Sequence, residues 1–92
     1  MFNHMLNKYL VEFLGTMFLV FIILATGNYI AIGMALAIGV FFGGSISGGA
    51  FNPAVAIVLY HAGKLSSSDL LPYIMAEILG ALAGFQVFKH FI

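Results

Sequence analysis

The stretch SGGAFNPAV, Ser47 to Val55, interrupts an otherwise apolar chain and decides its fold. Paired glycines permit a turn with positive φ, and an asparagine followed by a proline is typical of a helix start. The apolar run that follows ends near Tyr60 and rises only about 10 Å as a helix, whereas a bilayer core is about 30 Å thick. We therefore expect a re-entrant loop and half-helix over residues 45–60.

The composition indicates that lipid is the solvent. Hydrophobic residues make up 63% of the 92 residues and charged residues 7%, far from the balance of a soluble domain. Three lysines and no arginine give no basic surface for nucleic acid. Cysteine is absent, the three histidines lie far apart, and no nucleophile–base grouping occurs. We predict an integral, multi-pass membrane protein that contacts lipid, is not an enzyme, and needs no cofactor or metal.

Three runs are long and apolar enough to cross a bilayer: about 9–26, 29–44 and 70–88. Gly27-Asn28 predicts a tight turn between the first two, and Ser68 or Asp69 can cap the last. Small residues recur at every fourth position in two rows, which predicts close helix packing at 35, 39 and 43 and at 76, 80 and 84. The expected fold is all-α, with three transmembrane helices and one re-entrant half-helix.

The half-helix would begin deep in the membrane, where irregular backbone survives only inside protein or along a watery path. Carbonyl groups from Gly48 to Phe51 would then form a row of acceptors, and the Asn52 amide would add a donor. The positive end of the helix dipole disfavours cations there. This pattern indicates a passive path for water or a small neutral solute.

Three motifs resemble those of the major intrinsic protein family, the aquaporins and glycerol facilitators: VEFLGT (Val11–Thr16), ISGGAFNPAV (Ile46–Val55) and AEILGA (Ala76–Ala81). The resemblance covers only the first half of a family member, so residues 1–92 would form a single half-aquaporin-like domain. It implies a channel for water or small uncharged solutes such as glycerol, completed when two or more copies associate. Antiparallel copies of a homo-oligomer would reproduce the inverted repeat, and a weak lysine bias leaves both orientations open.

The resemblance also assigns roles to the residues of the central motif. Asn52 would be the midplane donor, and Pro53 and Ala54 would form the contact between facing half-helices. Gly48, Gly49, Ala50 and Phe51 would supply the carbonyl row.

Several positions depart from the family pattern or lie in the spans. Ala50 stands where many members have His, Val55 where a second-half loop carries Arg, and Ile32 aligns with the outer constriction. The resemblance implies that Glu12 supports the re-entrant loop by accepting hydrogen bonds from the backbone N–H groups of the loop. Glu77 replaces a family Gln, and we expect a hydrogen-bonded supporting role for it as well.

Two other functions remain open at this point. The chain could be a non-conducting interaction protein that binds another channel or membrane protein. An ion-coupled transporter is also compatible with a broken helix and an intramembrane Glu77. The transported solute is left undetermined by the sequence.

Overall fold

The computed structural model describes residues 3–92; Met1 and Phe2, which the predicted domain includes, lie outside the described residues. No strand occurs within residues 3–92, so the predicted all-α class is confirmed. Three of the helices are long and apolar enough to cross a membrane. The four helices are α1 (His4–Thr26), α2 (Tyr29–Ser47), α3 (Pro53–His61) and α4 (Ser67–Phe91).

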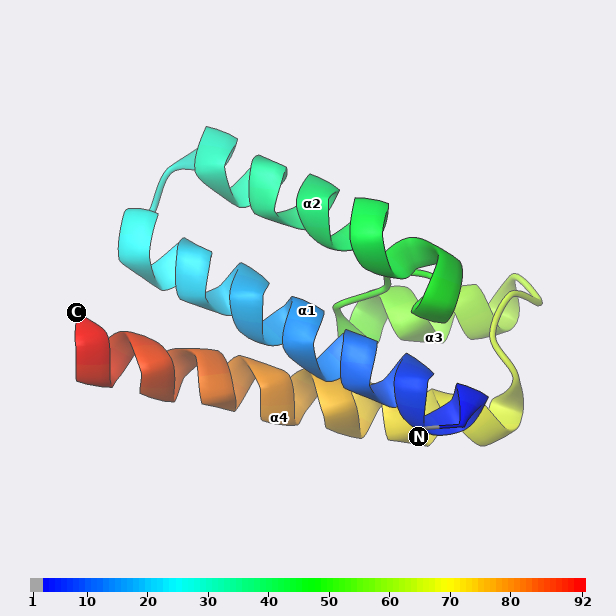
Figure 1. Cartoon of the computed structure of the whole chain (residues 1–92). Coiled ribbons are helices and arrows are strands. Elements are labelled where there is room, and N and C mark those ends of the chain that lie inside the picture. Colours follow the sequence, from blue (N-terminus) through cyan, green and yellow to red (C-terminus); the bar gives the residue numbers. More distant parts are fainter. Residues whose placement is uncertain (1–2) are drawn as a thin grey trace.

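The central helix of the bundle is α1, which packs against both α2 and α4 (Figure 1). The segment after α2 turns back toward the middle of the bundle, and α3 then returns to the end at which α2 stopped. Along this path α3 packs against α4. The two ends of the chain lie at opposite ends of the bundle, as three crossings require.

The turn between α1 and α2 follows the predicted chemistry. Gly27 ends α1 in the left-handed conformation, with φ 56°, and Asn28 caps α2 by accepting from the N–H groups of Ile30 and Ala31. The tight turn predicted at Gly27-Asn28 is thus confirmed.

At its other end α2 continues three residues beyond the predicted Gly44, because Gly48 is the first residue whose φ, 90°, leaves the helical range.

The start of α4 differs from the prediction. Ser66, and not Ser68 or Asp69, is the cap: its hydroxyl accepts from the Asp69 N–H at 3.3 Å. The Asp69 carboxylate instead binds the Lys8 ammonium group at 2.6 Å and the Tyr9 hydroxyl at 2.7 Å. A cap prediction from local sequence could not include partners that lie some sixty residues away.

Both rows of small residues lie at helix contacts, as predicted. A β-carbon at Gly80 would overlap the Phe13 carbonyl oxygen, so α4 approaches the α1 backbone directly. In the other row, a β-carbon at Gly43 would come within 2.6 Å of Val11 Cγ1. Close helix contact of this kind drives packing where lipid removes the hydrophobic difference between inside and outside.

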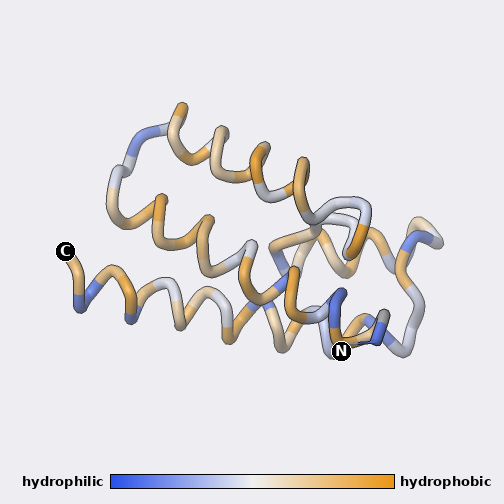
Figure 2. The backbone as a smooth tube through the Cα atoms, viewed as in Figure 1, coloured by the Kyte–Doolittle hydropathy of each residue, from blue (hydrophilic) through white to orange (hydrophobic). Residues whose placement is uncertain are grey.

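Most large apolar side chains face outward. Hydrophobic residues follow the long helices, and hydrophilic ones gather at the α1–α2 turn, between α3 and α4, and toward the chain ends (Figure 2). Tyr29 and Phe41 are about four-fifths exposed, at 82% and 80%. An outer surface of this kind suits contact with lipid.

Candidate functional site

The site is built on the segment from Gly48 to Asn52, which joins α2 to α3. Gly48 and Gly49 have φ values of 90° and 66°, which glycine adopts at little cost. Phe51 also has a positive φ, 52°, and is the one non-glycine residue of the described chain that does. Such a backbone is unfavourable for an aromatic residue, so the surrounding contacts must hold it.

Glu12 supplies the first of these contacts from α1. Its carboxylate accepts from the Phe51 N–H at 2.8 Å, the Ala50 N–H at 3.2 Å and the Ser47 hydroxyl at 2.6 Å. The glutamate is fully buried. A buried carboxylate needs several donors, and buried backbone N–H groups need an acceptor, so each side satisfies the other. These are the contacts that the family resemblance implies for Glu12.

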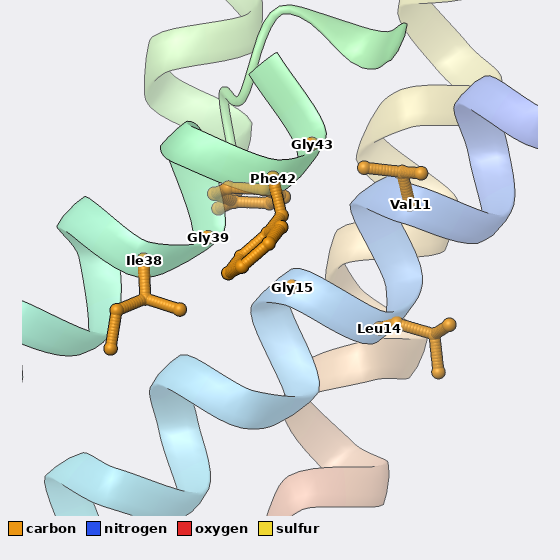
Figure 3. Close-up of a pocket in the computed structure, with 8 residues that line it drawn as sticks. Val11, Leu14, Gly15, Ile38, Gly39, Phe42 and Gly43 are labelled. Atoms are coloured by element: carbon orange, nitrogen blue, oxygen red, sulfur yellow. The ribbon is translucent and has the colours of Figure 1, made fainter. Parts of the chain in front are cut away.

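The Phe51 side chain supplies the second contact. Its ring occupies the space left by two glycines: a β-carbon at Gly15 would overlap the ring, and one at Gly39 would lie 3.0 Å from it. Beside the ring, a pocket of about 260 Å³ opens between α1 and α2, with apolar side chains such as Leu14 and Ile38 around it (Figure 3). The side chain of Phe51 therefore serves to pack the loop against α1 and α2. Of this residue, only the backbone carbonyl group remains available to a solute.

Asn52 starts α3 in the predicted manner. Its side-chain oxygen accepts from the Ala54 N–H at 2.7 Å, and Pro53 is the first helical residue, where a missing N–H costs nothing. The Asn52 NH₂ group is left as a donor. Within residues 3–92, the carbonyl groups from Gly48 to Phe51 accept no hydrogen bond, so acceptors lie next to that donor.

The start of α3 lies halfway along the bundle. Asn52 and Pro53 line a pocket of about 360 Å³ together with Thr16, near the middle of α1, and Glu77, near the middle of α4. Both of those residues lie within candidate membrane spans. The N-terminal end of α3 therefore faces the interior of the membrane region rather than its surface.

The other predicted pore residues do not line this pocket. Ala50 is a buried residue of the loop itself, Ile32 lies partly buried on α2, and Ala54 and Val55 are exposed at the start of α3. Of the predicted site residues, the structure thus gathers four in one pocket: Phe51, Asn52, Pro53 and Glu77.

Glu77 lies beside the loop, where the supporting role was expected. It lies near the Glu12 carboxyl group and the Asn52 N–H, but neither of its oxygens has a partner among the described residues. Glu12 accepts from two other loop donors, the Ala50 and Phe51 N–H groups, so the Asn52 N–H is the loop donor beside Glu77. The supporting role of Glu77 stays a prediction.

Two contributors to the site were missed in the sequence. Thr16 lies four residues after Glu12 on the same helix, and this i,i+4 spacing could have placed both on one face. Tyr73 donates its hydroxyl to the Ser47 carbonyl at 2.6 Å and so fixes the end of α2. No local signal points to that contact, because the two residues belong to different helices.

Comparison with known proteins agrees with this geometry. The chain is 38% identical to the "Glycerol uptake facilitator protein-like 6" of Lactiplantibacillus plantarum, over 95% of this chain and 44% of that protein. It is 45% identical to the "Aquaporin Z" of Brucella melitensis biotype 1, over 86% of this chain and 41% of that protein. It is 33% identical to the "Aquaporin Z" of Photorhabdus laumondii subsp. laumondii, over 85% of this chain and 40% of that protein. The chain thus spans about two fifths of the length of these relatives. The sequence pattern of the family described as "Major intrinsic protein" matches residues 2–92, and the chain belongs to this family of integral, multi-pass membrane proteins.

Proposed function

We propose that the chain forms a passive membrane pathway for water and small uncharged solutes such as glycerol, and that two oppositely inserted copies complete it. The observation that carries the proposal is a nine-residue helix, α3, whose start lies at mid-bundle. A helix that begins at membrane depth needs polar surroundings, which a hydrated path provides. Proteins of this family are channels rather than enzymes, and the relatives are named for water and glycerol transport.

The chemistry at Asn52 favours neutral hydroxylic solutes. Its NH₂ group can donate to a solute oxygen, and the free carbonyl groups from Gly48 to Phe51 can accept from a hydroxyl. The positive end of the α3 dipole faces the same place and disfavours cations. Val55 carries no charge to add a filter for water alone, so we expect small polyols to pass as well.

A second copy can supply the facing half-helix. Residues 3–92 contain one such helix, and the residues at its start, including Asn52 and Ala54, are exposed. A two-fold arrangement brings the same surface of both copies together, so one exposed end can contact its equivalent. Opposite insertion is needed for those ends to meet head to head at the midplane.

Flux through proteoliposomes tests the pathway. Asn52→Asp keeps a capping oxygen, because Asp caps as well as Asn, but removes the NH₂ donor and adds negative charge. Stopped-flow shrinkage should show a severalfold fall in water and glycerol flux for this variant. Asn28→Asp makes the same change at the cap of α2, in the turn outside the pathway, and should leave flux unchanged. Equal flux for the wild type and Asn52→Asp would reject the channel.

Cysteine crosslinking tests the assembly, and the chain has no cysteine of its own to interfere. Ala54→Cys places a thiol at the exposed start of α3, and Val58→Cys places one on the exposed flank of the same helix, 63% exposed. Facing half-helices should give a disulfide-linked dimer with Ala54→Cys only, because the bridged Cα atoms must lie within about 7 Å. Capture of a larger, different protein instead would favour the non-conducting interaction function.

A further inference from the structure

Two acidic side chains, Glu12 of α1 and Glu77 of α4, lie together in the middle of the bundle, and both are fully buried. Their carboxyl groups are neighbours, and both residues lie within candidate membrane spans. Two ionised carboxylates at this depth would repel each other in a medium of low dielectric constant, without water to solvate them. A pair that carries two negative charges is therefore unfavourable.

Neither glutamate has a cationic partner among the side chains that the structure describes. The one ion pair there joins Lys8 to Asp69, near the starts of α1 and α4. The half-helix α3, which also packs against α4, carries its titratable groups, Tyr60 and His61, at its far end, where both are exposed. The charge of the pair must therefore be reduced by a proton rather than balanced by a cation.

Glu12 is the member of the pair that is ionised. Its Oε2 accepts from the Ser47 hydroxyl and the Ala50 N–H, and its Oε1 accepts from the Phe51 N–H. A proton on either oxygen would compete with these donors. A carboxylate offers about four lone pairs to donors, so these bonds leave one lone pair free, on Oε1. The Tyr73 hydroxyl does not use it, because it donates to the Ser47 carbonyl.

Glu77 has one acceptor and one donor as polar neighbours, the Glu12 carboxylate and the Asn52 N–H. Neither of its oxygens has a hydrogen-bond partner in the described chain, and both are closed to water, so a solvent molecule cannot be the missing partner. A neutral carboxylic acid has both functions that this place requires, because its O–H donates and its carbonyl oxygen accepts. An ionised Glu77 could only accept, and it would face Glu12 with a like charge.

We propose that Glu77 is a neutral carboxylic acid that donates its proton to Glu12, so that the pair shares one proton and carries one negative charge. The Glu77 O–H then uses the free lone pair of Glu12, and its carbonyl oxygen is the acceptor for the Asn52 N–H. A hydrogen bond from an acid to a carboxylate is charge-assisted and therefore strong. Glu77 is thus a positioning residue that supports, partly through Glu12, the loop that leads to Asn52. This role concerns the loop and does not depend on conduction.

Infrared spectroscopy tests the protonation state, because a carboxylic acid and a carboxylate absorb at different frequencies. The chain has three acidic side chains, so few bands compete. At neutral pH, in a detergent without ester groups, the wild type should show one carboxylic-acid band, and Glu77→Gln should lose it. Asp69→Asn is the matched control: it removes the acid that binds Lys8 and should keep the band. Glu12→Gln replaces the acceptor of the proton and should shift the band.

Three results would overturn the proposal. The wild type could lack the band, the band could persist in Glu77→Gln, or it could stay at the same frequency in Glu12→Gln. Helix content by circular dichroism verifies that each variant is folded. None of these measurements uses flux, so their outcome is separate from that of the channel.

Unfolding as a function of pH is a second test, and it does not need a Glu12 variant. The folded chain keeps the Glu77 proton, whereas the unfolded chain releases it above the pKa of an exposed glutamate, about 4.3. The folded state then binds more protons than the unfolded state, so its stability falls as pH rises. Relative to Glu77→Gln, the unfolding equilibrium constant of the wild type should rise about tenfold per pH unit between about pH 5 and about pH 8. The histidines titrate in both proteins, so the comparison removes their effect. The same pH dependence in both proteins would show that Glu77 carries no such proton.

Discussion

The Phe51 ring lies directly against Gly15 of α1, at a point where any β-carbon would overlap it. This contact explains how a residue with positive φ is held in a membrane protein loop. The ring fixes the side chain between α1 and α2, and Glu12 fixes the backbone N–H of the same residue. The position of Asn52, the next residue, therefore depends on α1 from two directions.

We expect Gly15→Ala to displace the loop and reduce flux severalfold. The new methyl group would overlap the Phe51 ring, which is 3% exposed and has little room to move. Gly33→Ala is the matched control, because a β-carbon there meets nothing within 4 Å and alanine is the better helix former by about 1 kcal/mol. Stopped-flow flux and thermal unfolding in detergent check both. A Gly15→Ala protein with wild-type flux and stability would contradict the role given to Phe51.

Glu12→Ala should destabilise the protein more strongly than Gly15→Ala. It leaves the Ala50 and Phe51 N–H groups without an acceptor, at a cost of about 1–3 kcal/mol for each buried group. Ser47→Ala removes one donor to the same carboxylate and the acceptor of the partly buried Gly49 N–H, but it leaves the two bonds from the loop backbone to Glu12, so its effect should be smaller. Thermal unfolding followed by circular dichroism ranks the two variants. The reverse order would show that the loop does not depend on Glu12.

The sequence predicted those parts of the structure that rest on local chemistry. Gly27-Asn28 specifies its turn by its own conformational preferences, and Asn52-Pro53 specifies a helix start in the same way. The small-residue rows identified the helix faces that meet, because close approach at membrane depth needs missing side chains. The fold class follows from these local signals and from the length of the apolar runs.

The rest of the site depends on contacts between distant residues. Nothing in the neighbourhood of Phe51 predicts that its ring fills the space above Gly15, and nothing near Asp69 predicts that Lys8 is its partner. Whether a buried carboxyl such as that of Glu77 finds a donor depends in the same way on which neighbour reaches the donor first. Here Glu12 holds the Ala50 and Phe51 N–H groups.

Asp69→Ala should cost more stability than Lys8→Ala. The aspartate, whose side chain is 11% exposed, accepts from both Lys8 and Tyr9, so its removal leaves two donors without an acceptor. The Lys8 side chain is 27% exposed, so in Lys8→Ala water can replace part of the interaction that the Asp69 carboxylate loses. Lys64→Ala, at an exposed position, is the control and should be neutral. Unfolding at low and high salt checks the order, and equal effects of all three substitutions would exclude a structural role for this ion pair.

The Tyr73 hydroxyl is the last contact for which a specific effect is expected. It donates to the Ser47 carbonyl, a group at the end of α2 that the helix itself cannot satisfy. Tyr73→Phe removes only the hydroxyl. It keeps the ring and its edge-to-face contact with the Tyr9 ring, whose centroid lies 6.0 Å from that of Tyr73. The loss should be about 1 kcal/mol or somewhat more, because the carbonyl is left buried and unpaired. Tyr60→Phe removes a hydroxyl from a residue that is 37% exposed and should change little. Because Ser47 immediately precedes the loop, Tyr73→Phe should also lower flux, whereas Tyr60→Phe should not. Equal unfolding temperatures and fluxes for the two variants would show that the Tyr73–Ser47 hydrogen bond does not position the loop.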